Sequence, residues 1–380
     1  MNPPDVLAWR DGRIEALDQT ALPHQVTVLR ISTVTELVAA IARLAIRGAP
    51  VLGAAGALGV ALAVRQGDRE GWDEARLKAQ LMRIADARPT AVNLRREVSA
   101  VAAYLPYGRQ AVEAAALAVV EFATTASHQI SHRGAAYLRE ACGPEKTGRR
   151  LRVHTHCNTG SLACLGWGTG LGVIRVLHEQ GALAEVIVGE TRPLLQGARL
   201  TCWELGQLGI EHRLAGDGAG PFLISQGRSD AVVVGADRVA ANGDVANKIG
   251  TYSLALAAHR AGIPFLVAVP ESTIDEATPT GAAIPIDRPG RHQGAQLRVR
   301  HHPGRSGLGG GHREKTDSER TVAQRFSALN SRVSVPPPKL RTPNSHRPEF
   351  SSAFRPRRRS AAPAGTSRRA ARPRSRTCGR

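Results

Sequence analysis

Residues 153–172 read VHTHCNTGSLACLGWGTGLG and hold the strongest fold signal in the chain. A short strand-like segment, residues 151–155, leads to Cys157 and then to a turn rich in glycine and small residues. Helical periodicity begins near residue 169. Open α/β sheets bind their ligands where a strand gives way to such a turn. A free cysteine is equally often a small core residue, so this stretch alone leaves two interpretations of Cys157.

Strands alternate with helices after residue 145. The spacing predicts strands at 151–155, 184–189, 210–214, 231–234 and 264–269, and helices at 169–180, 194–208 and 248–261. Strands that are continuously apolar and separated by helices indicate a parallel, doubly wound sheet. We therefore expect a Rossmann-like α/β domain over residues 146–286.

Residues 1–145 are expected to form a mainly helical domain. Short strands and a turn occupy residues 1–30, and helical spacing follows at 33–44, 51–64, 72–86, 91–104 and 111–138. Residues 51–64 are almost wholly Ala, Gly, Leu and Val, which predicts a buried helix. We find no secretory signal at residues 1–17 and no apolar stretch near the 18 to 20 residues or so that span a membrane.

The five cysteines are spread widely and form no CxxC pair. Their number and spacing argue against a disulfide framework and a structural zinc site, and favour a reduced, cytoplasmic compartment. The net charge of +19 is uneven: residues 1–286 carry +1 and residues 287–380 carry +18. The Arg- and Pro-rich residues 287–380 are predicted to be a disordered basic tail.

Polar segments at the ends of predicted elements suit an anionic ligand. They are residues 47–50, 88–90, 190–197, 235–238 and 247–251, the last of which is expected to open a helix. Free backbone N–H groups and the helix dipole favour phosphate at helix N-termini. The chain has neither a GxGxxG after residues 151–155 nor a GxxxxGK[ST] sequence. A small phosphorylated ligand is therefore favoured over a dinucleotide or a nucleoside triphosphate.

Cys157 and Asp237 each follow a predicted strand, so both can lie at the carboxyl edge of the sheet. In a pocket with little water, one could donate a proton and the other accept it. Alternatively, Asp237 is only the salt-bridge partner of Arg238 or Lys248. His154 and His156 alternate on a strand as metal ligands can, but no third ligand has suitable spacing, so no metal is expected.

Six motifs resemble methylthioribose-1-phosphate isomerases, which belong to the superfamily of the regulatory subunits (alpha, beta, delta) of the eukaryotic initiation-factor nucleotide-exchange complex. The motifs are IRGAP at 46–50, RPTAVNL at 88–94, THCNTG at 155–160, ETRPLLQG at 190–197, GADR at 235–238 and NGDVANKIGT at 242–251. They occur in the family's order, and the likeness covers about residues 7–286.

The resemblance implies an aldose–ketose isomerase of methionine salvage that acts on 5-methylthioribose 1-phosphate without an added cofactor, as a homodimer. It implies that Cys157 and Asp237 are catalytic, with Asp237 the proton donor. The residues implied to hold the phosphosugar are Arg47, Gly48, Ala49, Arg88, Gln196, Asn247 and Lys248. The residues leave open whether hydrogen moves as a proton through an enolate or as a hydride.

Residues 287–380 depart from the family pattern, which continues with an acidic segment and a closing helix. The Arg-, Pro-, Gly- and Ser-rich run in their place resembles an out-of-frame translation of a GC-rich gene. Three alternatives remain: a ribose 1,5-bisphosphate isomerase of the same superfamily, an inactive scaffold like the exchange-factor subunits, and a nucleic-acid binder acting through the basic tail. The presence of Cys157 and Asp237 favours an enzyme over a scaffold, and the tail has few aromatic residues for base stacking.

Overall fold

A five-stranded parallel sheet carries the second half of the chain. The computed structural model describes residues 5–88, 91–284 and, as main chain only, 296–299. The sheet has the strand order β10-β7-β4-β5-β6, and every neighbouring pair is parallel. Its strands are β4 (Leu151–Thr155), β5 (Leu183–Gly189), β6 (His212–Ala215), β7 (Ala231–Val234) and β10 (Phe265–Val267).

The strand order reverses between β4 and β7. From β4 the chain adds β5 and β6 on one side, then returns to place β7 and β10 on the other side of β4. Such a reversal opens a crevice at the carboxyl ends of the two central strands, because their connections leave in opposite directions. Cys157 follows β4 and Asp237 follows β7. The two residues therefore lie on either side of this crevice.

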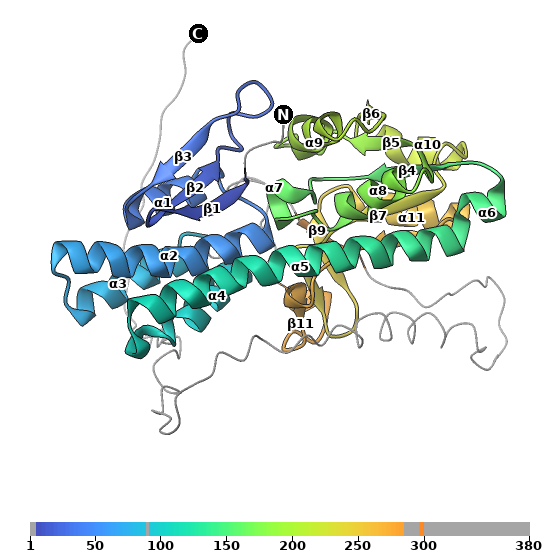
Figure 1. Cartoon of the computed structure of the whole chain (residues 1–380). Helices are drawn as coiled ribbons and strands as arrows, with labels where there is room; N and C mark the ends of the chain where they lie inside the picture. Colours follow the sequence, from blue (N-terminus) through green and yellow to red (C-terminus); the bar gives the residue numbers. More distant parts are fainter. Residues whose placement is uncertain (1–4, 89–90, 285–295, 300–380) are drawn as a thin grey trace, which may run out of the picture. The chain divides into compact units, whose positions relative to one another are not determined.

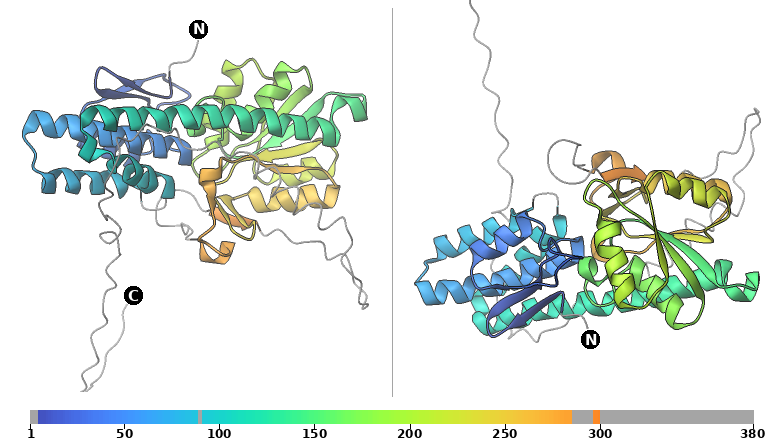
Figure 2. Two further views of the ribbon diagram at one scale, coloured as in Figure 1. Left: turned by 60° about the horizontal axis from the view of Figure 1, so that its bottom comes forward. Right: turned by 90° about the horizontal axis from the view of Figure 1, so that it is seen from above.

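Helices cover both faces of the sheet (Figure 2). The covering helices are α8 (Gly170–Glu179), α9 (Cys202–Gln207), α10 (Ala219–Ser225) and α11 (Thr251–Ala261). Ala231 and Val233 of β7 belong to the hydrophobic cluster that includes α8, whereas Val232 and Val234 belong to the cluster with Leu254 of α11. Both faces of the strand are buried, which explains its uninterrupted apolar sequence. The prediction of a doubly wound Rossmann-like sheet is confirmed.

The first half of the chain combines a small sheet with helices. Its elements are the antiparallel strands β1 (Leu7–Arg10), β2 (Arg13–Leu17) and β3 (Val28–Ile31), and the helices α1 (Val34–Ala42), α2 (Ala49–Glu70), α3 (Glu74–Ala85) and α4 (Val92–Ala102), followed by a 3-10 turn, η1 (Leu105–Tyr107). Thr33 begins α1 with a capping box to Glu36, which satisfies two backbone donors that the helix itself leaves free.

Helix α2 is the core helix of this half. By length and hydropathy it is the one helix among the described residues that could cross a membrane, but 72% of its apolar window is buried inside the protein. The prediction that no apolar stretch comes near this length is wrong for α2, because residues 48–64 carry no charged side chain. Arg65, Asp68, Arg69 and Glu70 follow at the end of the helix. Its Ala and Gly residues allow close packing against α4 and α5.

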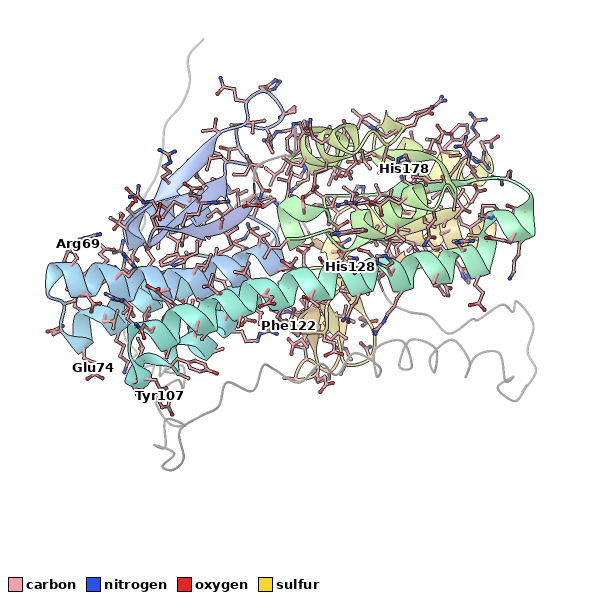
Figure 3. All side chains as sticks on the ribbon, in the orientation of Figure 1. Arg69, Glu74, Tyr107, Phe122, His128 and His178 are labelled. Atoms are coloured by element: carbon pink, nitrogen blue, oxygen red, sulfur yellow. The ribbon has the colours of Figure 1, made fainter. Side chains whose placement is uncertain are left out.

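One 34-residue helix, α5 (Arg109–Cys142), runs through both halves of the chain. It lies against α2 near its start and against α8 near its end (Figure 1). Val112 and Ala116 belong to the core cluster of the first half, and Ala135 and Leu138 to that of the sheet. Between these two stretches, the side chains of Phe122 and His128 stand out from the helix (Figure 3). The domain boundary predicted at 145/146 falls in the four-residue helix α6 (Pro144–Thr147) and stays a prediction.

A second sheet, with the order β11-β8-β9-β12, follows β7 and is absent from the sequence-based prediction. Its strands are β8 (Arg238–Ala240), β9 (Val245–Lys248), β11 (Ile274–Asp275) and β12 (Gln296–Val299). The expected helix at 248–261 is wrong at its start, since Lys248 ends β9 and α11 begins at Thr251. Asn242 and Gly243, with φ +83° at Gly243, form the hairpin turn that an Asn-Gly pair favours.

Strand β12 lies within the stretch predicted to be a disordered tail. It pairs antiparallel with β9 from Gln296 to Val299. Residues 296–299 therefore differ from the prediction, and their alternating QLRV sequence carries the period of a strand. The remainder of 287–380 lies outside the described residues, and the predictions of disorder and of a frame change there stay predictions.

Candidate active site

Cys157 stands on a strained turn just after β4. Its φ is +65°, a left-handed conformation that residues other than Gly adopt rarely and that clusters at functional sites. The turn is held by its neighbours: the Cys157 N–H donates to Thr191 Oγ1 at 2.9 Å, and the Thr201 hydroxyl donates to the Cys157 carbonyl oxygen at 2.6 Å. Hydrogen bonds on both sides of the residue thus fix the position of its half-buried thiol.

The loop after β5 supports this turn and is itself strained. Thr191 has φ +66°, which is unfavourable for a β-branched residue. The Asp217 carboxylate, from the end of β6, accepts the N–H groups of Thr191 at 2.8 Å and Arg192 at 2.7 Å. The ends of three neighbouring strands, β4, β5 and β6, are therefore joined by side-chain hydrogen bonds.

Arg47 and the start of α2 reach the same turn from the first half of the chain. The Arg47 guanidinium donates to Asn158 Oδ1 at 3.3 Å and to the Asn158 carbonyl oxygen at 3.2 Å. Gly48 precedes α2 with φ +97°, and a Cβ there would lie 2.4 Å from the Ala163 carbonyl oxygen. Only glycine fits this position. The free N–H groups at the start of α2 lie beside Arg47, which together favour an anion.

Asp237 lies at the base of the β8–β9 hairpin. Its N–H donates to the Ala246 carbonyl oxygen at 2.9 Å, which places it beside the strand that carries Asn247 and Lys248. Arg238 pairs with Asp275 at 3.4 Å instead. Among the described residues, no salt bridge reaches Asp237, so the interpretation that makes it only a partner of Arg238 or Lys248 is wrong. Its side chain is exposed, which also corrects the expectation that it is enclosed in a dry pocket.

Lys248 is a buried cation, with 8% of its surface exposed. Within the part of the chain that the structure describes, no carboxylate lies within salt-bridge distance of it. Asn247 is also buried, and its amide donates to the Thr251 hydroxyl at 3.1 Å. A buried ammonium group without a protein counter-ion is costly unless a ligand supplies negative charge.

Gln196 lies at the carboxyl edge of the sheet, whereas Arg88 lies in a link between two helices. Gln196 is buried in the loop after β5, and its Oε1 has no hydrogen-bond partner among the described residues, which leaves it available to a ligand hydroxyl. Arg88 is half-buried in the link between α3 and α4. The implied contact of Arg88 with substrate stays a prediction.

His156 joins the Cys157 turn to the β9–α11 turn. It is buried, and its Nε2 donates to the Ile249 carbonyl oxygen at 2.6 Å. Burial lowers the pKa of His156, and the charge of Lys248 lowers it further. His154 is also buried, and burial lowers its pKa to about 4. No group of three or more possible metal ligands occurs within residues 5–88 and 91–284.

The other described cysteines are packing residues. Burial raises the pKa of Cys142 to about 11 and that of Cys164 to about 12, and it also raises the pKa of Cys202. Thiols whose pKa is raised this far are poor nucleophiles and poor proton donors near neutrality. Cys164 and Cys202 therefore fit a role in packing.

Two residues that sequence reasoning does not single out are central to the site. Asn158 holds Arg47, and Glu204 accepts hydrogen bonds from Asn158 and from Ser161. Asn158 lies inside the THCNTG motif, so its position beside Cys157 is a usable signal. Glu204 stands between Trp203 and Leu205 in a helix, and only the fold places it beneath the turn.

Comparisons with known proteins agree with this arrangement. The model of the initiation factor 2 subunit family matches residues 45–300. A probable bifunctional methylthioribose-1-phosphate isomerase/methylthioribulose-1-phosphate dehydratase from Nocardia farcinica is 50% identical over 74% of this chain, which spans half the length of that relative. A methylthioribose-1-phosphate isomerase from Desulforudis audaxviator is 46% identical over 75% of this chain and 82% of the relative.

A solved structure shows the same fold. The 5-methylthioribose 1-phosphate isomerase from Pyrococcus horikoshii OT3 superposes with a TM-score of 0.68 and 31% identity, covering 79% of this chain and 89% of the other. The chain therefore belongs to the initiation factor 2 subunit family. Within that family it groups with the methylthioribose-1-phosphate isomerases, which confirms the resemblance found in its motifs.

Proposed function

We propose that this protein is an aldose–ketose isomerase that converts 5-methylthioribose 1-phosphate to 5-methylthioribulose 1-phosphate in methionine salvage. The observation that carries the proposal is the position of Cys157 and Asp237. They follow β4 and β7, the two strands between which the sheet order reverses, and this is where doubly wound sheets bind small ligands. Relatives that carry this activity in their names are 46% to 50% identical to the chain.

The reaction moves one hydrogen from C2 to C1 of the sugar, and substrate and product have the same atoms. The phosphate on C1 blocks ordinary ring opening to a free aldehyde. The enzyme therefore has to promote both the cleavage of the bond to the ring oxygen and the transfer of hydrogen from C2 to C1. Asp237 donates a proton to the ring oxygen as the ring opens, and Cys157, on the other side of the crevice, accepts a proton from the sugar, so the number of protons is unchanged. The hydrogen bonds to Thr191 and from Thr201 hold the Cys157 turn still, which preserves the required orientation.

The phosphate is bound, in this proposal, by cationic side chains and helix N–H groups at the carboxyl edge of the sheet. Lys248 is buried without a described carboxylate partner, and Arg47 is held beside the turn by Asn158. The N–H groups of Gly48 and Ala49 add the positive end of α2. Gln196, Asn247 and Arg88 are proposed to contact the sugar hydroxyls or the phosphate.

We also propose that the protein acts in the cytoplasm as a homodimer. Exposed apolar residues lie along one side of α11 and its preceding turn: Ile249 is 38%, Tyr252 41% and Leu256 51% exposed. A second copy could cover such a stripe. The mass of the protein in solution, measured by sedimentation equilibrium, checks this, and a monomer at micromolar concentration would contradict it.

An isomerisation assay tests the proposed function. Purified full-length protein is given 5-methylthioribose 1-phosphate, and the ketose product is measured. Ribose 1,5-bisphosphate supplies the comparison substrate. We expect turnover of the first substrate, and Cys157→Ser should lower kcat by about 10²- to 10⁴-fold, the usual contribution of a proton-transferring group.

The matched control is Cys202→Ser, which changes a thiol outside the crevice and should keep the wild-type kcat. Equal rates for Cys157→Ser and wild type would show that the site is wrongly assigned. Faster turnover of ribose 1,5-bisphosphate than of 5-methylthioribose 1-phosphate would show that the bisphosphate is the substrate. A folded but inactive wild-type chain would favour the scaffold interpretation.

A further inference from the structure

A buried carboxylate lies directly beneath the Cys157 turn. Glu204 projects from α9 and is 5% exposed. It accepts three hydrogen bonds, from Asn158 Nδ2 at 2.5 Å, from the Ser161 hydroxyl at 2.7 Å and from the Leu162 N–H at 3.1 Å. The backbone is shaped to admit it, because a Cβ at Gly160 would lie 2.3 Å from Glu204 Oε2.

The contacts of Glu204 determine which way the Asn158 amide faces. Asn158 Nδ2 donates to Glu204 and, at 3.2 Å, to Thr201 Oγ1, whose own hydroxyl donates to the Cys157 carbonyl oxygen. Asn158 Oδ1 is thereby directed to the other side, where it accepts from Arg47 at 3.3 Å. A reversed amide would direct an NH₂ group at the guanidinium, and two donors cannot pair.

We propose that Glu204 is a positioning residue, which holds Arg47 in place to bind the anionic group of the substrate by fixing the orientation of the Asn158 amide. This inference rests on the proposed function, since it assigns Arg47 to the phosphosugar. Glu204 itself touches neither the thiol of Cys157 nor the sheet crevice in any described contact. It acts through Asn158 on Arg47, and through Ser161 and Leu162 on the start of α7 (Ser161–Cys164).

The local chemistry requires an acceptor oxygen that faces Asn158. Asn158 Nδ2 can only donate, so Glu204 Oε2 has to accept from it. Glu204 Oε1 receives the Leu162 N–H, which also can only donate, and the Ser161 hydroxyl, which can donate or accept. Burial has the largest influence and raises the pKa of Glu204 above its ordinary value, although the hydrogen bonds from Asn158, Ser161 and the Leu162 N–H and the charge of Arg47 oppose that rise. A buried charge that lowers stability is commonly retained where it serves function.

Glu204→Gln tests the inference, because the new side chain keeps the shape and replaces one acceptor by a donor. The introduced Oε1 is held by the Ser161 hydroxyl and the Leu162 N–H, so the NH₂ group meets Asn158 Nδ2. The Asn158 amide then reverses, and Arg47 loses its Oδ1 acceptor and keeps only the Asn158 carbonyl oxygen. We expect KM for 5-methylthioribose 1-phosphate to rise about 10-fold or more, up to the roughly 100-fold that displacement of a binding group costs. We expect kcat to change less than KM.

The double variant Asn158→Asp/Glu204→Gln provides the rescue. The introduced aspartate accepts from both the introduced glutamine amide and Arg47, so KM should return to within about 3-fold of wild type if orientation of Arg47 is the cause. Glu185→Gln is the control, since Glu185 lies in β5 near the opposite edge of the sheet and pairs with Arg213. It should leave kcat and KM unchanged.

Wild-type kcat and KM in Glu204→Gln would overturn the inference, and so would a folded double variant that is as impaired as the single one. An inactive wild-type chain would instead overturn the proposed function. In that event, crystal structures of wild type and Glu204→Gln decide the inference alone: Arg47 displaced from Asn158 Oδ1 supports it, and Arg47 still bonded to Oδ1 refutes it.

Discussion

Two aspartates flank the same strand, β7, and differ in burial and in ion pairing. Asp230 precedes β7, at the amino edge of the sheet, and is buried. It accepts from both Arg149 and Arg152, at distances from 2.5 to 3.3 Å, and from the Arg152 N–H at 2.8 Å. Asp237 follows β7, at the carboxyl edge, is exposed, and has no salt bridge within the described residues.

The two carboxylates differ in whether their negative charge is paired with arginines within the protein. Every acceptor position of Asp230 is used inside the protein, so its carboxylate has no capacity left for a ligand. Within the described part of the chain, Asp237 is held through its main chain, by the hydrogen bond to Ala246, and no salt bridge engages its carboxylate. The same contrast holds for cations: the arginines at the amino edge are paired, whereas Lys248 at the carboxyl edge is buried without a described carboxylate.

The largest effect is expected from Asp237→Asn. Loss of the proton donor should lower kcat by about 10²- to 10⁴-fold. The melting temperature should hardly move, since substitutions at exposed positions usually change the free energy of unfolding by no more than about 0.5 kcal/mol. Steady-state kinetics and calorimetry measure the two quantities. A large loss of stability with unchanged kcat would give Asp237 the structural role assigned here to Asp230.

Asp230→Asn should show the reverse pattern. Removing one partner of a buried ion pair costs about 3 to 5 kcal/mol. Because the Arg149 side chain is 51% exposed and keeps its hydration, we expect about 2 kcal/mol. Urea unfolding measures this loss. The kcat of the folded variant should equal that of wild type. A lower kcat in the fully folded variant would show that Asp230 is not purely structural.

The smallest effect is an acid-dependent loss of stability at the amino edge. Burial alone would raise the pKa of Asp230, but hydrogen bonds from Arg149 and Arg152 outweigh it and lower the pKa from 3.8 to about 2. A lowered pKa contributes stability that is fully present above the unfolded-state value of 3.8 and is lost as the pH falls through 2. That contribution is about 1 to 2 kcal/mol after allowance for solvent screening.

The measurement is the difference in unfolding free energy between wild type and Asp230→Asn. It should shrink as the pH is lowered from about 5 towards 2, because protonation removes the charge that the variant already lacks. A difference for Asp230→Asn that is constant over this range would show that its ion pairs do not control stability.

Much of this arrangement can be predicted from local sequence. Residues 231–234 are predicted as a strand with the bounds that the structure has, because four consecutive apolar β-branched or small residues fit a strand buried on both faces. Cys157 is placed after a strand because the strand-like segment 151–155 gives way there to a turn rich in glycine and small residues. The pairing of Cys157 with Asp237 at one sheet edge follows from the parallel topology alone.

Other features could not be predicted, because they depend on contacts between distant segments. The sequence pattern assigns Lys248 to a helix, and the Asn242-Gly243 turn instead makes it end a strand beside Asp237. Asp237 is exposed because it lies at the base of the β8–β9 hairpin. The hydrophobic periodicity of the sequence does not predict this hairpin. Glu204 lies 46 residues from Asn158 in the chain, and its role exists only because α9 packs beneath the turn.

The sequence by itself determined the alternation of strands and helices, the parallel sheet and the two strand ends that carry Cys157 and Asp237. These depend on apolar periodicity and on turn residues, which act over a few positions. The tertiary structure decided which charges are paired and which remain available. That choice depends on burial and on partners contributed by remote segments, as Arg149 and Arg152 neutralise Asp230 while Asp237 and Lys248 form no salt bridge among the described residues.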